Sequence, residues 1–259
     1  MVKDFVKNHF PDLMYAVVAS LYYITHPNQK SKIIYPVGNC WRVIAHDNRY
    51  YTFKDSISRG TKKKQEIKYS RYTDEGFCQI ETDDLVVDVG AFVGEFALPA
   101  SRCAESVLAI EPDPQTFQCL SKQVSFHKNI TAINKLPHET ETTVSFKSAD
   151  DGSESSLIDV DAGGFDEIKM TTVTLDGLLS EHGISQVDFL KMDAEGAEPE
   201  VLRGIENTPV EKFAIDVGAE RKGGGTRADV IEVLEQQGYE YKIIPDQNND
   251  PVLFAKYKK

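Results

Sequence analysis

Positive charge is scarce in this sequence. Its 259 residues include 29 lysines and arginines against 41 aspartates and glutamates, a formal net charge of −12 at pH 7. A surface with this excess of negative charge repels phosphate backbones and anionic lipids. Nucleic acid is therefore not the expected partner, and the one dense lysine cluster, residues 62–68, is interpreted as a solvated loop.

Cysteines are also few, and their spacing is wide. Cys40, Cys78, Cys103 and Cys119 form no Cys-x-x-Cys pair, which argues against a zinc site and against a disulfide framework. Reduced thiols in a cytoplasmic protein are the simplest interpretation. Cys103 and Cys119 fall in helical patterns, so both are expected in the core.

Long hydrophobic runs are missing too. A membrane-spanning helix needs about 20 apolar residues, and the longest candidate here, LMYAVVASLYYI at residues 13–24, is shorter. It also lacks the basic start and small-residue cleavage site of a signal peptide. We expect no transmembrane span and interpret residues 13–24 as a helix that packs on the main domain.

From residue 84 onward, short apolar runs alternate with helical patterns. Strands are expected at 85–89, 106–110, 130–134, 187–192 and 213–217, and helices at 93–104, 114–127, 175–182, 199–205 and 227–237. A strand pair around a polar loop is expected at 141–147 and 168–174, and a final antiparallel pair at 239–244 and 252–257. This alternation predicts an α/β fold with a mostly parallel, doubly wound sheet. Residues 1–80 lack this alternation of strands and helices. A helix and a hairpin (40–45 with 49–53) indicate that they form an extension or cap, and a Rossmann-like domain is expected at 81–259.

The carboxyl ends of the expected parallel strands predict where a ligand binds. In such sheets ligands lie beyond these ends, at the point where strand order reverses. The residues directly after four of the strands are Gly90, Glu111, Asp193 and Gly218. We therefore expect these four residues to line one cleft.

The first strand leads into a cofactor-type turn. Asp88 is followed by Gly90, Phe92 and Gly94, and Glu111 ends the second strand, where an acid can bind a ribose diol. A dinucleotide site needs a glycine where Phe92 stands, and the charge of Asp88 would repel a diphosphate. S-adenosylmethionine has no diphosphate and carries cationic groups, so the pattern favours it over NAD.

Five stretches resemble the FkbM-type methyltransferases. They are VVDVGAFVGEF (86–96), AIEPDP (109–114), SESSL (153–157), VTLDGLL (173–179) and DFLKMDAEGAEPEVLRGIE (188–206). The resemblance implies a Rossmann-like class I methyltransferase fold, S-adenosylmethionine as cofactor, and methyl transfer to an oxygen of a saccharide or a hydroxylated metabolite.

The resemblance also implies roles for single residues. Asp88, Gly90 and Gly94 match the cofactor loop of the family and Glu111 its ribose-binding acid, while Asp193, Glu195 and Gly196 match its Asp-x-Glu-Gly segment. The sequence departs from the family at Phe92, where many members have asparagine, and at 135–138 after the third strand.

Carboxylates supply the candidate catalysts. Asp193 is expected to orient the acceptor, to act as base, or to bind the ammonium group of the cofactor. Glu195 is a second catalytic candidate, because neighbouring carboxylates raise each other's pKa values; the alternative is that it caps the next helix. Glu198 is a weaker candidate. A metal held by Asp193, Glu195 and Asp216 or Glu220 would lack a tight ligand motif, so no metal is expected.

Two other functions stay open at this point: an NAD-dependent sugar-modifying enzyme, and a relative that binds the cofactor without turnover. The expected partner is a small-molecule or glycan acceptor, contacted by the loops at 150–156 and 221–227. An oligomer is compatible with the sequence.

Overall fold

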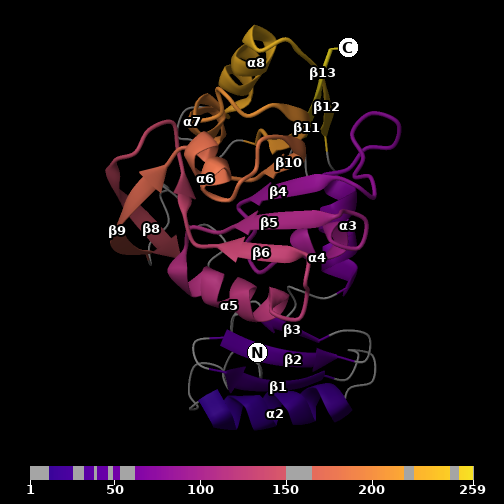
Figure 1. Cartoon of the computed structure of the whole chain (residues 1–259). Helices are drawn as coiled ribbons and strands as arrows, with labels where there is room; N and C mark the ends of the chain where they lie inside the picture. Colours follow the sequence, from indigo (N-terminus) through magenta and orange to yellow (C-terminus); the bar gives the residue numbers. More distant parts are fainter. Residues whose placement is uncertain are drawn as a thin grey trace.

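A seven-stranded sheet forms the centre of the molecule (Figure 1), in the order β12-β13-β11-β10-β4-β5-β6. The computed structural model describes residues 12–25, 32–37, 40–45, 49–52, 62–149, 165–218, 225–245 and 251–258. The strands of this sheet are β4 (Leu85–Val89), β5 (Ser106–Ile110), β6 (Ile130–Ile133), β10 (Val187–Met192), β11 (Val210–Asp216), β12 (Tyr239–Pro245) and β13 (Pro251–Tyr257). Strands β6, β5, β4, β10 and β11 run parallel, and β13 pairs antiparallel with both β11 and β12. The predicted mostly parallel sheet with an antiparallel C-terminal pair is confirmed.

The central strands are apolar on both faces, which is why their sequences do not alternate. Val86 and Phe189 belong to the core on one face of the sheet, and their neighbours Val87 and Leu190 belong to the core on the other. Because both faces are buried, polar side chains such as Asp88 and Lys191 lie near the ends of these strands.

Helices cover both faces. They are α4 (Ala97–Ala100), α5 (Pro114–Val124), α6 (Leu175–Glu181), α7 (Glu198–Arg203) and α8 (Arg227–Gln236). Side chains of α4 and α5 pack in one core, and those of α6, α7 and α8 in the other. At the start of α5, the Asp113 carboxylate accepts hydrogen bonds from the backbone of Gln115 and Thr116, at 2.9 and 2.7 Å, so the predicted cap is confirmed.

The helix expected at 93–104 is wrong in its length. Phe92 and Gly94 have positive φ angles of 51° and 88°, and only residues 97–100 are α-helical before the chain turns again. Cys103 lies in that turn and is exposed, whereas Cys119 on α5 is buried. The expectation of a core position is therefore wrong for Cys103 and confirmed for Cys119.

The N-terminal elements form a separate layer below α5 (Figure 1). Helix α2 (Asp12–Thr25) lies on a three-stranded antiparallel sheet of β1 (Lys32–Val37), β2 (Cys40–Ala45) and β3 (Arg49–Thr52). The predicted hairpin is the β2–β3 pair. Ala16 and Ala19 of α2 pack with Ile34 and Trp41 of the N-terminal sheet. The expectation that this helix packs on the main domain is therefore wrong. No helix within the described ranges is long and apolar enough to cross a membrane.

The lysine cluster is helical. Residues 62–68 belong to α3 (Lys62–Arg71), on which Gln65 is buried. The interpretation as a loop is therefore wrong, although residues 62–64 are exposed to solvent as expected. A small sheet of β7 (Leu136–Pro137), β9 (Phe165–Val173) and β8 (Thr143–Ala149) contains the strand pair predicted around residues 141–174. The predicted acceptor loop at 150–156, residues 221–224 of the loop predicted at 221–227, and Glu220 lie outside the described residues.

Candidate active site

The ends of β4 and β10 touch each other through their backbones. Gly90 has a φ of +73°, and a Cβ added to it would lie 1.8 Å from the carbonyl oxygen of Asp193. The Asp193 N–H in turn donates to the Val89 carbonyl at 3.1 Å. Only glycine fits this position, and the contact brings the predicted cofactor loop and the predicted catalytic segment together.

The loop after β4 is also tied to the end of β5. The Phe92 N–H donates to Glu111 Oε2 at 2.8 Å, and the Asp113 N–H donates to Glu111 Oε1 at 2.9 Å. Burial raises the pKa of Glu111 to about 8. Each carboxylate oxygen has a second lone pair, so Glu111 keeps the capacity to bind another hydroxyl.

Phe92 has a packing role that the sequence did not reveal. Its ring packs against a buried cluster of Cys40, Val93 and Cys119, between the N-terminal sheet and α5. Because the ring is engaged in this packing, the size of Phe92 is not by itself an argument against a diphosphate.

Asp88 finds its partner in Lys191. Both side chains are buried, and Lys191 Nζ lies 3.0 Å from Asp88 Oδ1. The hydrogen bonds of Lys191 go to the carbonyls of Gly90 and Val89, at 2.7 and 3.2 Å. Burial raises the pKa of Asp88 against the opposing attraction of Lys191. Lys191 thus fixes the turn at the end of β4, from the neighbouring strand.

Asp193 is surrounded by donors. Lys68 Nζ lies 3.1 Å and the Tyr72 hydroxyl 2.9 Å from Asp193 Oδ2, and Lys191 Nζ lies 3.9 Å from the same oxygen. Burial alone would raise the pKa of Asp193, but the charges of Lys68 and Lys191 outweigh it and hold this pKa well below its usual range. Asp193 is therefore an anion at any physiological pH.

Asp216 at the end of β11 joins the same network. The Arg71 guanidinium lies 2.6 Å and the Tyr72 hydroxyl 3.0 Å from Asp216 Oδ2, and the Gly218 N–H donates to Asp216 Oδ1 at 3.0 Å. The sequence reasoning missed the three donors Lys68, Arg71 and Tyr72. Their spacing of i, i+3 and i+4 could have indicated them, because it places two basic groups and a hydroxyl group on one face of a helix.

Glu195 and Glu198 lie in or beside the turn that precedes α7. Glu198 Oε1 accepts hydrogen bonds from the backbone of Ala194 and Gly196, at 2.9 and 3.1 Å, so Glu198 fixes the turn before α7. Glu195 sits in that turn with a φ of +50°, a conformation that costs energy in a residue other than glycine. Burial, together with the negative charge of Asp193, raises the pKa of Glu195 to about 8; burial also raises that of Glu198, to about 7.

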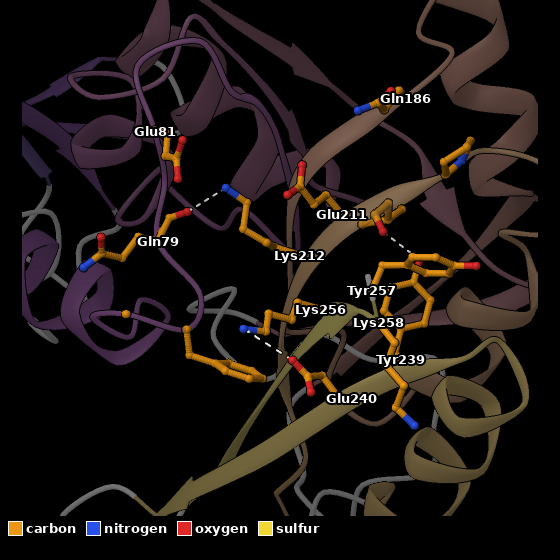
Figure 2. A pocket seen from close by; sticks show the side chains of 14 residues that line it. Gln79, Glu81, Gln186, Glu211, Lys212, Tyr239, Glu240, Lys256, Tyr257 and Lys258 are labelled. Atoms are coloured by element: carbon orange, nitrogen blue, oxygen red, sulfur yellow. Dashed lines mark hydrogen bonds and ion pairs between the residues drawn. The ribbon is translucent and has the colours of Figure 1, made fainter.

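A groove of about 1170 Å³ lies at the amino ends of the parallel strands, away from the carboxyl ends that lead into Gly90, Glu111 and Asp193 (Figure 2). Its lining includes Gln186, Val210 and Tyr239, which lie where β10, β11 and β12 begin. Lys256 in this groove pairs with Glu240 at 3.3 Å. The groove is therefore separate from the carboxyl-end site. Among the described residues, no three His, Cys, Asp or Glu side chains are grouped to hold a metal.

The sequence from residue 88 to residue 241 matches the methyltransferase FkbM domain, more than half of the chain. The chain belongs to the FkbM methyltransferase family. Methyltransferase sdnD of Sordaria araneosa is 23% identical over 197 residues, which cover 62% of this chain and 75% of that protein. The 31-O-demethyl-FK506 methyltransferase FkbM of Streptomyces tacrolimicus is 25% identical over 209 residues, which cover 68% of this chain and 78% of that protein.

Solved structures agree with the fold. The fibrillarin pre-rRNA processing protein of Methanococcus jannaschii superposes with a TM-score of 0.50 at 13% identity, over 88% of this chain and 98% of that one. This member of the family thus has the Rossmann-like class I methyltransferase fold, and its cofactor is S-adenosylmethionine. This sets aside the NAD-dependent alternative.

Proposed function

We propose that this FkbM methyltransferase transfers a methyl group from S-adenosylmethionine to a hydroxyl group of a saccharide or another hydroxylated metabolite, with Glu195 as the general base. The observation that carries the proposal is the contrast between two neighbouring carboxyls. Asp193 is kept ionised by its cations, whereas the pKa of Glu195 is raised to about 8. Two acids with separated pKa values suit two different roles in one reaction.

The cofactor side of the site rests on the loop after β4. This loop is held against the ends of β5 and β10, and the carboxyl of Glu111 beside it suits a nucleoside, because it can accept hydrogen bonds from a ribose diol. When bound, S-adenosylmethionine supplies an electrophilic methyl group on a cationic sulfur.

The charge balance of the site favours this cofactor. Carboxyl groups outnumber cationic groups among the side chains gathered at the strand ends and on α3: Asp88, Asp193, Glu195, Glu198 and Asp216 against Lys68, Arg71 and Lys191. A sulfonium or ammonium group that binds beside Glu195 and Glu198, whose pKa values are raised, favours their ionised forms, whereas an anionic acceptor opposes their ionisation. The proposed acceptor group is therefore a neutral hydroxyl.

A hydroxyl is a weak nucleophile, and a base that takes its proton speeds the transfer. A base is most effective when its pKa lies near the working pH, as that of Glu195 does. Asp193 is too weak a base for this task, because its cations stabilise the ionised form. In this proposal Asp193 binds and orients, and Glu195 receives the proton.

The test has two steps. Calorimetric titration with S-adenosylhomocysteine is expected to show binding by the parent protein and a binding free energy weaker by about 1–3 kcal/mol in Glu111→Ala, which lacks the carboxyl group that accepts hydrogen bonds from the ribose. Methyl transfer from radiolabelled S-adenosylmethionine is then measured on a panel of glycosides and hydroxylated polyketides. Glu195→Gln is expected to lower kcat by about 100-fold or more with S-adenosylhomocysteine affinity unchanged.

Glu181→Gln, on the exposed end of α6, is the matched control and is expected to keep full activity. A folded parent protein that does not bind S-adenosylhomocysteine refutes the proposed function. Unchanged kcat in Glu195→Gln refutes the assignment of the base and leaves the cofactor assignment standing.

A further inference from the structure

Helix α3 contributes to the site although it lies outside the segment that matches the family. The match begins at residue 88, whereas α3 ends at Arg71. Lys68, Arg71 and Tyr72 nonetheless contact Asp193 and Asp216, the acids at the ends of β10 and β11. The site is thus assembled from the family domain and from a helix that precedes it.

The two cations beside Asp193 differ in their surroundings. Lys191 is 3% exposed and is hydrogen-bonded to the turn after β4, so it is part of the interior. Lys68 is 31% exposed and its partner Asp193 14%, so this ion pair reaches solvent. Asp193 raises the pKa of Lys68, which opposes the loss expected from burial, so both partners of the pair are charged. Lys68 is therefore the cation that a ligand entering beside Asp193 would meet.

Tyr72 holds this arrangement in place. Its side chain is fully buried and lies edge-on to Phe96, with ring centroids 6.0 Å apart. Its hydroxyl lies between Asp193 and Asp216, at 2.9 and 3.0 Å. A hydroxyl has one hydrogen to donate, so the two carboxylates compete for it. The negative charges of the two acids are compensated by one cation of α3 each, Asp193 by Lys68 and Asp216 by Arg71.

We infer that Lys68 is a positioning residue of the methyl-transfer site, which acts through Asp193 by cancelling the negative charge that Asp193 would otherwise present to the sulfonium of the donor. The inference rests on the proposed function, in which the donor binds at the loop after β4, and Gly90 at the start of that loop contacts Asp193. The positive charge of the sulfonium disperses during transfer, so an uncompensated carboxylate would stabilise the bound donor more than the transition state. Lys68 prevents this ground-state stabilisation.

The inference is tested by comparing two ligands that differ in this charge. S-adenosylmethionine carries the sulfonium, and S-adenosylhomocysteine carries a neutral thioether in its place. Calorimetry gives the ratio of their affinities for the parent, for Lys68→Met and for Lys68→Arg. Lys68→Met is expected to shift the ratio about fivefold or more toward S-adenosylmethionine, because it removes one cation near the sulfonium. Lys68→Arg keeps the charge and is expected to restore the ratio of the parent.

Lys62→Met is the matched control. Lys62 lies on the same helix, is exposed, and pairs with Glu66 at 3.9 Å; its removal is expected to change the ratio less than twofold. A merely structural role for Lys68 would weaken both ligands alike and leave the ratio unchanged, and this result would overturn the inference. Should Lys68→Met not fold, as judged by circular dichroism, Lys68→Gln takes its place. A parent protein that binds neither ligand overturns the proposed function itself.

Discussion

Substitution of Gly90 by alanine tests the contact between β4 and β10 directly. The new Cβ would lie 1.8 Å from the Asp193 carbonyl oxygen, and the strand ends must move apart by at least about 1.2 Å to reach a contact of 3.0 Å. The left-handed φ of +73° adds about 1–2 kcal/mol of strain for a residue with a Cβ. With the cost of forcing packed backbone apart, we expect a loss of about 3–5 kcal/mol in the free energy of unfolding.

Two further glycines provide a graded comparison. Gly183 has a φ of +69° and no atom within 4 Å of an added Cβ, so Gly183→Ala measures the strain alone. Gly94 has a φ of +88°, and its added Cβ would lie 3.2 Å from Leu120 Cδ1, a side-chain end that can yield. The expected order of destabilisation is Gly183→Ala, then Gly94→Ala, then Gly90→Ala.

Urea unfolding gives the three free energies, and calorimetry with S-adenosylhomocysteine gives the effect on the site. Gly183→Ala is expected to cost about 1 kcal/mol and to leave binding intact, while Gly90→Ala is expected to lose binding as well as stability. If Gly90→Ala costs no more than Gly183→Ala, the backbone contact between the two strand ends is absent and the described geometry is incorrect.

Three other predictions concern single side chains. Folding raises the pKa of Glu111 from 4.5 to about 8. Between these pH values the folded state binds one proton more than the unfolded state, so the free energy of unfolding falls as the pH rises. In Glu111→Gln, this fall, measured by urea unfolding between pH 5 and pH 9, is expected to be smaller by roughly 2–4 kcal/mol. The Asp176 carboxylate accepts hydrogen bonds from the backbone N–H groups of residues 206–208. These bonds lower the pKa of Asp176 against the opposing effect of burial. Asp176→Ala is expected to lower the free energy of unfolding by about 1–3 kcal/mol near neutral pH, and by progressively less as the pH falls below 3.8. Cys103 is the one exposed thiol of the four cysteines, so an aromatic disulfide reagent is expected to label one thiol rapidly in the native protein and four after unfolding; rapid labelling of two or more would contradict the burial of the others.

The sequence was informative where local pattern decides structure. The bounds of β10 agree with the prediction at both ends, because a short apolar run buried on both faces leaves little ambiguity. The helix at 93–104 was overestimated, since hydrophobic pattern does not report the left-handed backbone at Phe92 and Gly94. The position of α2 on its own sheet depends on tertiary packing, which an apolar helix sequence does not specify.

For the site as well, local sequence pattern indicated some residues, whereas tertiary packing determined others. Gly90, Glu111 and Asp193 were predictable because parallel strands end at one edge of a sheet. The partner of Asp193 on α3 was not, since Lys68 is 125 residues away in the sequence. Side-chain roles within one turn were also ambiguous from spacing, and only the hydrogen bonds of Glu198 show that it fixes the turn before α7.

The reach of α3 has a consequence for folding. Lys68 and Asp193 are 125 residues apart, and Arg71 and Asp216 are 145 apart. Contacts of such long range close large loops and form late. During synthesis α3 emerges well before the two acids that it contacts, with a sequence, KKKQEIKYSR, that has few apolar side chains of its own. The central sheet can therefore assemble before the ion pairs of α3 do, and competence for the cofactor is expected to be the last property that the folding chain acquires.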